Sequence, residues 1–233
     1  MLKSNLAILL TIAIATGCCH CPTPRPVITV NIGADDTYHP PPISCDIPSS
    51  AMLAVQRFPQ EQTNTCWAAS GQMAMHLFHK NVSQCDQIRH QAPLANCECK
   101  LCPDSAFLPA DDCNNGGWPD FTAYGFDSSR IRGALRLDEL KQEIACRKSP
   151  VLFAWKDELN VDKPSGHMMV AYGYSDDMIL VMDPSPTCDL DANGVQGKLY
   201  NPQLITYEEY LYGNSPAGGH WDDIYAIQLG SGK

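Results

Sequence analysis

Apolar positions recur with helical spacing in two stretches of the chain. Residues 66–79 combine alanine, methionine, leucine and phenylalanine, a composition that favours a helix with a broad apolar face. A second helix is predicted over 137–147. Asp138 in its first turn and Arg147 at its end match the helix dipole, and Pro150 stops the helix.

Short apolar runs in the second half of the chain predict strands. They cover 151–155, 167–174, 178–182 and 224–229. Helices followed by an antiparallel sheet indicate an α+β fold, with a helical half, a sheet half and a cleft between them.

The N-terminus has the pattern of an export signal. Lys3 precedes an apolar run over 6–15, which is too short for the roughly 20 residues that a membrane-spanning helix needs. We therefore expect a signal peptide over 1–17. The small residues before Cys18 resemble a bacterial lipobox, which predicts that Cys18 is lipidated and that the protein is anchored in the periplasm or at the cell surface. Ala15 stands where the lipobox usually has leucine, so ordinary cleavage or a retained anchor stays open.

A proline-rich segment separates this signal from the folded part. Residues 18–50 include the run Pro40-Pro41-Pro42, and such composition favours an extended, semi-rigid tether. A chain of 233 residues holds one or two domains, and we place one domain over 51–233.

Charge and cysteine content narrow the class of protein. Sixteen basic and 26 acidic residues leave a net charge of −10, which argues against broad binding to nucleic acid. Twelve cysteines indicate an exported protein in which most are paired.

Five of the cysteines fall in a segment over 84–117 that shows little periodicity, so we interpret it as a disulfide-stapled insertion. They are Cys85, Cys97, Cys99, Cys102 and Cys113. The spacing of the middle three also suits zinc, but an oxidising compartment favours disulfides. We expect no metal and no cofactor.

Three residues carry the candidate chemistry. Cys66 begins the first predicted helix, where the helix dipole and free amide groups stabilise a thiolate nucleophile. His167 opens one predicted strand, and Asp183 follows the next. If these strands are adjacent and antiparallel, His167 and Asp183 lie side by side as a base and the group that orients it.

Each of these residues has a plainer interpretation. Cys66 could be a buried or disulfide-bonded cysteine, although setting aside a lipidated Cys18 and a free Cys66 leaves ten cysteines, enough for five bridges. Asp183 precedes a proline, as in ordinary turns. Six other histidines compete with His167: His20, His39, His76, His79, His90 and His220.

Taken together, these motifs resemble the papain-like cysteine peptidases. The features are Gln60 six positions before Cys-Trp-Ala-Ala at 66–69, His167 at the start of a strand ending in Gly-Tyr, and Asp183-Pro184. The resemblance spans about residues 55–229. It is closest to the bacterial branch that includes bacteriocin-leader-processing peptidases and the cysteine protease effectors of plant pathogens, because papain has Asn where this chain has Asp183.

The resemblance implies a role for each motif residue. Cys66 would be the nucleophile, His167 the general base and acid, and Asp183 the orienting residue. Gln60 would stabilise the oxyanion together with the Cys66 backbone N–H. Gln62, four positions before Cys66, is a rival oxyanion donor.

A second segment resembles the substrate-binding strand of papain. Cys-Asn-Asn-Gly-Gly-Trp-Pro over 113–119 has one asparagine more than the papain segment, and Thr63 stands where papain has the cysteine that pairs with it. The resemblance implies that Gly116, Gly117 and Trp67 bind substrate.

The sequence thus predicts an exported, monomeric cysteine peptidase that acts on a peptide or protein through an acyl-enzyme. An acyltransferase or cell-wall amidase with the same triad is an alternative. A non-catalytic, disulfide-stapled surface module that binds a partner is another; it predicts an oxidised Cys66 far from His167.

Overall fold

The computed structural model describes residues 44–93, 113–157, 165–185, 203–213 and 219–230, all of which belong to one compact unit. The predicted signal peptide, Cys18, most of the tether and the middle of the insertion lie outside the described residues. Those predictions therefore stay predictions.

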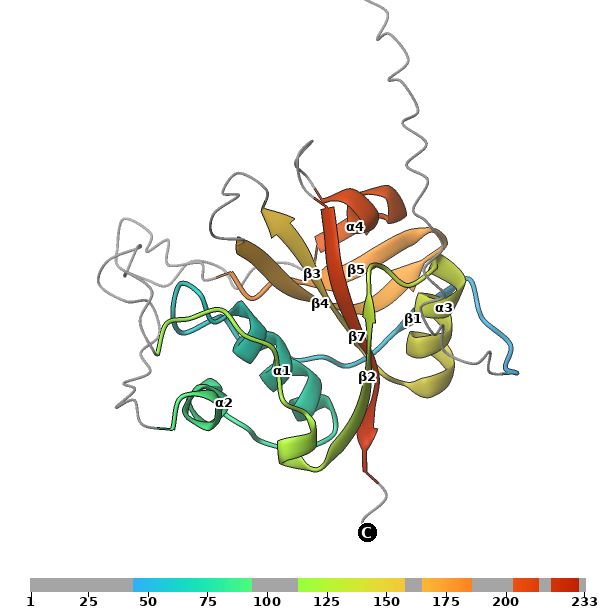
Figure 1. Cartoon of the computed structure of the whole chain (residues 1–233). Coiled ribbons are helices and arrows are strands. Elements are labelled where there is room, and N and C mark those ends of the chain that lie inside the picture. Colours follow the sequence, from blue (N-terminus) through green and yellow to red (C-terminus); the bar gives the residue numbers. More distant parts are fainter. Residues whose placement is uncertain (1–43, 94–112, 158–164, 186–202, 214–218, 231–233) are drawn as a thin grey trace, which may run out of the picture. The chain divides into compact units, whose positions relative to one another are not determined.

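Helix α1 (Cys66–Leu77) occupies the first predicted helical stretch and ends two residues earlier than expected. Almost all of its first ten residues are buried. A helix buried on most of its surface has apolar residues on nearly every face, and α1 has this pattern. Figure 1 shows α1 beside a shorter helix, α2 (Gln84–Gln91).

Helix α2 lies at the start of the 84–117 segment, where the weak periodicity had not predicted a helix. Ser83 and Asp86 form a capping box that begins this helix. Its buried face is largely polar. Gln87 donates to the carbonyl of Ala68, and Gln84 donates to the carbonyl of Pro59.

The second predicted helix is present as α3 (Leu137–Gln142), which continues as a π-helical turn (Glu143–Arg147). A disulfide joins Cys146 of this turn to Cys45, near the end of the predicted tether. The tether is therefore fastened to the folded domain just before β1.

A seven-stranded antiparallel sheet forms the centre of the molecule (Figure 1). Its main order is β2-β7-β3-β4-β5-β6, and β1 pairs with β4. The strands are β1 (Ser50–Met52), β2 (Phe126–Arg132), β3 (Val151–Asp157), β4 (Ser165–Ser175), β5 (Met178–Met182), β6 (Gln203–Thr206) and β7 (Gly219–Leu229). The four predicted strands correspond to β3, β4, β5 and β7. The apolar pattern did not predict β1, β2, β6, a short 3₁₀ turn (Thr122–Tyr124) or helix α4 (Tyr207–Tyr212).

The core lies on both faces of the sheet. On β4, Met168 and Val170 pack with α1, whereas Met169 and Ala171 pack with α3 and α4. A strand buried on both faces has a continuous apolar run, and this is the pattern over 167–174. The α+β class is confirmed, with helices on both sides of the sheet.

Candidate active site

Cys66 is the first residue of α1, and it is the free cysteine among the described residues. The other described cysteines, at positions 45, 85, 113 and 146, are all disulfide-bonded. Thr65 makes no side-chain cap, so the first amide groups of α1 are not taken by a capping oxygen. The Met168 backbone N–H donates to the Cys66 sulfur at 3.4 Å, which places the nucleophile against β4.

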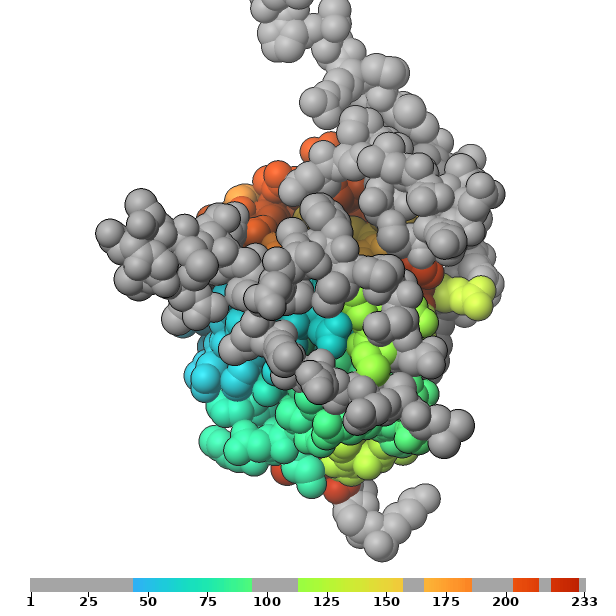
Figure 2. Space-filling view, turned by 90° about the vertical axis from the view of Figure 1, so that its left-hand side faces the viewer, coloured from blue at the N-terminus to red at the C-terminus, as the bar shows by residue number. Residues whose placement is uncertain are grey.

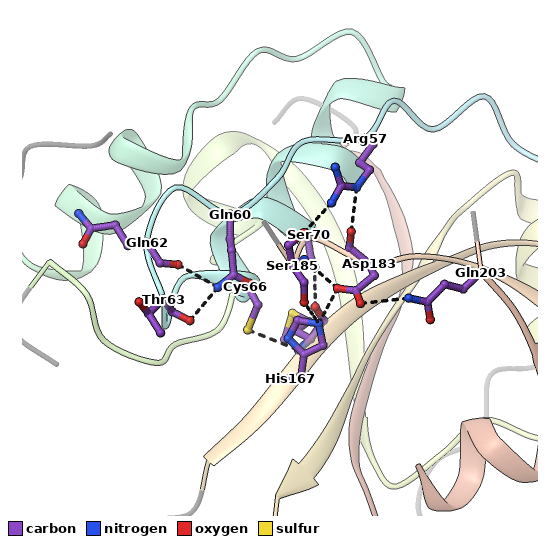
Figure 3. Close-up of polar contacts among 11 residues, drawn as sticks. Arg57, Gln60, Gln62, Thr63, Cys66, Ser70, His167, Asp183, Ser185 and Gln203 are labelled. Carbon is purple, nitrogen blue, oxygen red and sulfur yellow. Dashed lines mark hydrogen bonds and ion pairs between the residues drawn. The ribbon is translucent and has the colours of Figure 1, made fainter. Parts of the chain in front are cut away.

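His167 and Asp183 lie at the same end of a strand pair, as the sequence predicts. Strands β4 and β5 are antiparallel neighbours with Val170 opposite Met182. Nε2 of His167 lies 2.7 Å from Oδ1 of Asp183 (Figure 3). The distance is that of a charge-assisted hydrogen bond.

The contacts of His167 define which ring nitrogen serves the cysteine. Nε2 faces Asp183 and also the Ser185 hydroxyl at 3.2 Å. Nδ1 is therefore the nitrogen left for Cys66, with which the ring also hydrogen-bonds. Cys66, His167 and Asp183 form a chain of the nucleophile–base–orienter kind.

Electrostatics favour the ionised form of the His167–Asp183 pair. Burial opposes the charge on His167, but hydrogen bonds to Asp183 and Cys66 outweigh it and raise the pKa of His167 to about 10. Burial likewise opposes the charge on Asp183, but the His167 bond and the contacts of Ser185 lower its pKa to about 2. In cysteine peptidases, a neighbouring imidazolium favours the thiolate form of the nucleophile over the thiol.

Gln60 is buried next to Cys66, whereas the side chain of Gln62 extends away from it (Figure 3). The Gln60 amide donates to the carbonyls of Gln62 at 2.9 Å and Thr63 at 2.7 Å. Both of its N–H groups therefore bind the loop that leads into α1. Its part in the oxyanion site stays a prediction, and it requires one of these bonds to be exchanged for the substrate oxygen.

The competing histidines in the described part of the chain either bind other residues or lie at the opposite end of α1 from Cys66. His220 contacts the Tyr210 carbonyl at 2.8 Å and Asp223 at 2.6 Å, so both of its ring nitrogens are engaged. His90 pairs with Asp120 at the surface. His76 and His79 lie at the far end of α1 and just beyond it.

Comparison with known proteins decides the family. The peptidase C39-like family matches residues 52–194, more than half of the chain. The chain belongs to this family. It is a family of papain-like cysteine peptidases, so the predicted enzyme class and its bacteriocin-leader-processing-like branch are confirmed.

One similar solved structure is the peptidase domain of Streptococcus ComA, described as a bifunctional ABC transporter in a quorum-sensing pathway. The two chains are 12% identical and superpose with a TM-score of 0.43, over 74% of this chain and 97% of the other. No curated protein matches the sequence.

In this C39-like chain, residues 113–119 pack beside the start of α1. The Asn64 amide groups bond Asn114, through its side-chain oxygen at 2.8 Å and its carbonyl at 3.0 Å. Figure 2 shows the same neighbours on the surface, with the light-green segment after Cys113 beside the cyan residues that lead into α1. Buried Asn114, one of the two asparagines in the motif, therefore anchors the segment.

Trp67, the second residue of α1, packs against this segment and hydrogen-bonds its backbone. Its ring is buried and its Nε1 donates to the Asn115 carbonyl at 3.0 Å. This placement lets Trp67 support the 113–119 segment, and a direct contact of Trp67 with substrate stays a prediction. A Cβ on Gly117 would meet the Trp67 ring at 2.8 Å, whereas Gly116 is exposed and has open space around it. Substrate binding by Gly116 and Gly117 stays a prediction.

Three residues of the site were not singled out from the sequence: Arg57, Ser185 and Gln203. Arg57 and Gln203 hydrogen-bond to Asp183 from other segments, whereas Ser185 lies two residues after it and donates its backbone N–H to its carboxylate (Figure 3). Arg57 is 126 residues from Asp183, and no local motif marks such a contact.

Among the described residues, no group of three His, Cys, Asp or Glu side chains could hold a metal ion. None of the helices in that part of the chain has the length and apolar character needed to cross a membrane.

Proposed function

We propose that this chain is an exported cysteine peptidase that hydrolyses peptide bonds through Cys66, His167 and Asp183. The observation that carries the proposal is the free Cys66 at a helix start, hydrogen-bonded to a histidine that is itself paired with a carboxylate. The same arrangement argues against a binding module in which Cys66 is oxidised.

Two covalent steps follow from this geometry. The Cys66 thiolate attacks the peptide carbonyl and forms the carbon–sulfur bond, and His167 gives its proton to the leaving nitrogen as the carbon–nitrogen bond breaks. Water then attacks the thioester and His167 takes a proton from it. The carbon–sulfur bond breaks, which releases the carboxylic acid product and restores the Cys66 thiolate beside the protonated His167. Asp183 holds the histidine in the required orientation through both steps.

The oxyanion of each step would lie at the start of α1. The Cys66 backbone N–H points along the helix axis and is one donor. The Gln60 amide is the second donor, once it exchanges one carbonyl of the 60–65 loop for the substrate oxygen. The exposed backbone around Gly116 would bind the extended peptide.

We further propose that the protein is exported and held at the membrane by a lipid on Cys18. The Cys45–Cys146 disulfide and the oxidised Cys85 and Cys113 support an oxidising compartment. In a bacterial host fed radiolabelled palmitate, the wild type should carry the label and the Cys18→Ala variant should not. A wild-type protein that takes up no label would rule out the lipid anchor.

The peptidase activity is tested with the full chain and its Cys66→Ala variant. Unfolded casein should yield new amino termini with the wild type and none with Cys66→Ala, while circular dichroism shows that the variant is folded. Products joined to an added amine, in place of free carboxylic acids, would indicate the acyltransferase. Equal cleavage by both proteins would overturn the assignment of Cys66.

A further inference from the structure

The carboxylate of Asp183 is held on both oxygens. Oδ1 accepts from His167 Nε2 and from the Ser185 backbone N–H, each at 2.7 Å. Oδ2 accepts from the Gln203 side-chain amide at 3.2 Å. Gln203 is the first residue of β6, the neighbour of β5, so the sheet itself positions this donor.

The backbone around Asp183 is held by hydrogen bonds from the segment 57–60, which precedes α1. The turn 183–185 follows the last residue of β5, where strand pairing no longer fixes the backbone. Arg57 Nε donates to the Asp183 carbonyl at 3.0 Å, and its Nη2 donates to the Ser185 carbonyl at 2.6 Å. The Gln60 backbone N–H donates to the Pro184 carbonyl at 2.7 Å. Residues 57–60 thus bind all three carbonyls of the turn.

We propose that Arg57 and Gln203 are positioning residues that keep Asp183 in contact with His167. Arg57 acts on the turn through backbone carbonyls, and Gln203 acts on the carboxylate directly. The inference rests on the proposed function, because it concerns the same triad. The segment 57–60 would then have two roles. It places Gln60 beside Cys66, and it binds the turn that carries Asp183.

A displacement of the turn that carries Asp183 would change the pKa of His167. Among the described residues, the titratable groups that face this ring are Cys66 from α1 and Asp183 after β5, with Arg57 behind the turn. If the turn moves, His167 loses its hydrogen bond to the Asp183 carboxylate and the imidazolium is stabilised less. The pKa of His167 then falls from about 10 towards its ordinary value of 6.5.

The experiment uses the full-length protein and three variants, Arg57→Met, Arg57→Lys and Gln203→Met. Arg132→Met and Gln228→Met serve as matched controls, because both side chains are exposed on strands away from the turn. The titration midpoint of His167 is measured by NMR of the ring, together with kcat and KM for casein-derived peptides.

We expect Arg57→Met to lower the midpoint by about one pH unit or more, and to lower kcat roughly tenfold to a hundredfold with KM within about twofold. This is a partial loss of the roughly 100- to 10,000-fold that a well-positioned acid–base group contributes. Arg57→Lys should recover part of both changes, and Gln203→Met should give a smaller change of the same sign. The two controls should match the wild type.

A folded Arg57→Met protein with an unchanged His167 midpoint would overturn the proposal. If that variant does not fold, Arg57→Lys and Gln203→Met decide, since an unchanged midpoint in both is equally contrary. The NMR titration needs no substrate. A shifted midpoint in a chain without peptidase activity would therefore refute the proposed function and leave the positioning role intact.

Discussion

Nε2 of His167 lies 2.7 Å from Oδ1 of Asp183, although sixteen residues separate them along the chain. The contact exists because β4 and β5 form a tight hairpin, so the start of one strand meets the end of the other. Asp176 in the connecting turn adopts a positive φ of 50°, a conformation that aspartate tolerates better than most residues. A two-strand unit thus carries both the base and its orienting carboxylate.

Replacing Asp183 by Asn should remove the charge and keep the size of the side chain. We expect kcat/KM at pH 7 to fall roughly 100- to 10,000-fold, because His167 loses its orientation and its ion pair. The pKa of His167 should fall below the value of about 10 that the pair maintains. Asp177→Asn, at an exposed position on the same hairpin, is the control and should leave kcat/KM unchanged. Full activity in Asp183→Asn would contradict the role of this carboxylate.

The same pair predicts how stability depends on pH. The pKa of Asp183 is about 2 in the folded protein against an ordinary 3.8, so its contribution is present above pH 3.8 and is lost as the pH falls through 2. The pKa of His167 is raised from 6.5 to about 10, so its contribution is complete below pH 6.5 and is lost as the pH rises through 10.

The difference in the free energy of unfolding between wild type and Asp183→Asn should therefore be largest between about pH 4 and pH 6.5. It should shrink towards pH 2 and towards pH 10. Urea unfolding at pH 2.5, 5 and 9.5 measures it. A difference that grows at pH 9.5 would show that the pair is not ionised as described.

The Cys45–Cys146 disulfide should stabilise the fold without serving the chemistry. It joins cysteines 101 positions apart, and closing such a loop contributes about 2–4 kcal/mol. The double variant Cys45→Ser/Cys146→Ser should lose that amount in urea unfolding under non-reducing conditions and keep its kcat. Loss of kcat in a folded double variant would instead link the disulfide to the active site.

The two glycines of the 113–119 segment should respond differently to alanine. A Cβ on Gly117 would approach Gln91 Oε1 to 2.5 Å and the Trp67 ring to 2.8 Å, so Gly117→Ala should cost about 1–3 kcal/mol of stability. Gly116→Ala meets nothing within 4 Å and should leave stability unchanged. Thermal unfolding of both variants makes the comparison, and equal losses would contradict the packing of this segment.

Apolar periodicity predicted the elements with continuous apolar faces, which are α1, α3, β3, β4, β5 and the second half of β7. It missed α2 because the buried face of that helix includes Gln84 and Gln87, which bond backbone carbonyls. It missed β2 because an irregular register between Asp127 and Ser129 breaks the alternation, leaving Phe126 and Ile131 as its buried apolar residues.

The residues of the candidate site likewise fall into those that local sequence patterns predicted and those that they did not. Cys66, His167 and Asp183 stand at the ends of predicted elements, so local patterns were enough to suggest that they meet. Arg57 and Gln203 hydrogen-bond to Asp183 from distant segments. Such bonds produce no periodic pattern of apolar and polar residues in the sequence. The engagement of the Gln60 amide by Gln62 and Thr63 likewise depends on how one loop folds.

The most direct test of the account is the alkylation of the unreduced protein by iodoacetamide at pH 5.5, followed by peptide mass mapping. A thiolate stabilised by His167 reacts at this pH, whereas an ordinary thiol does not. We expect rapid modification at Cys66 in the wild type, slow modification in His167→Gln, and none at that site in Cys66→Ala. A wild-type protein in which Cys66 is unreactive at pH 5.5, or is found in a disulfide, would contradict it.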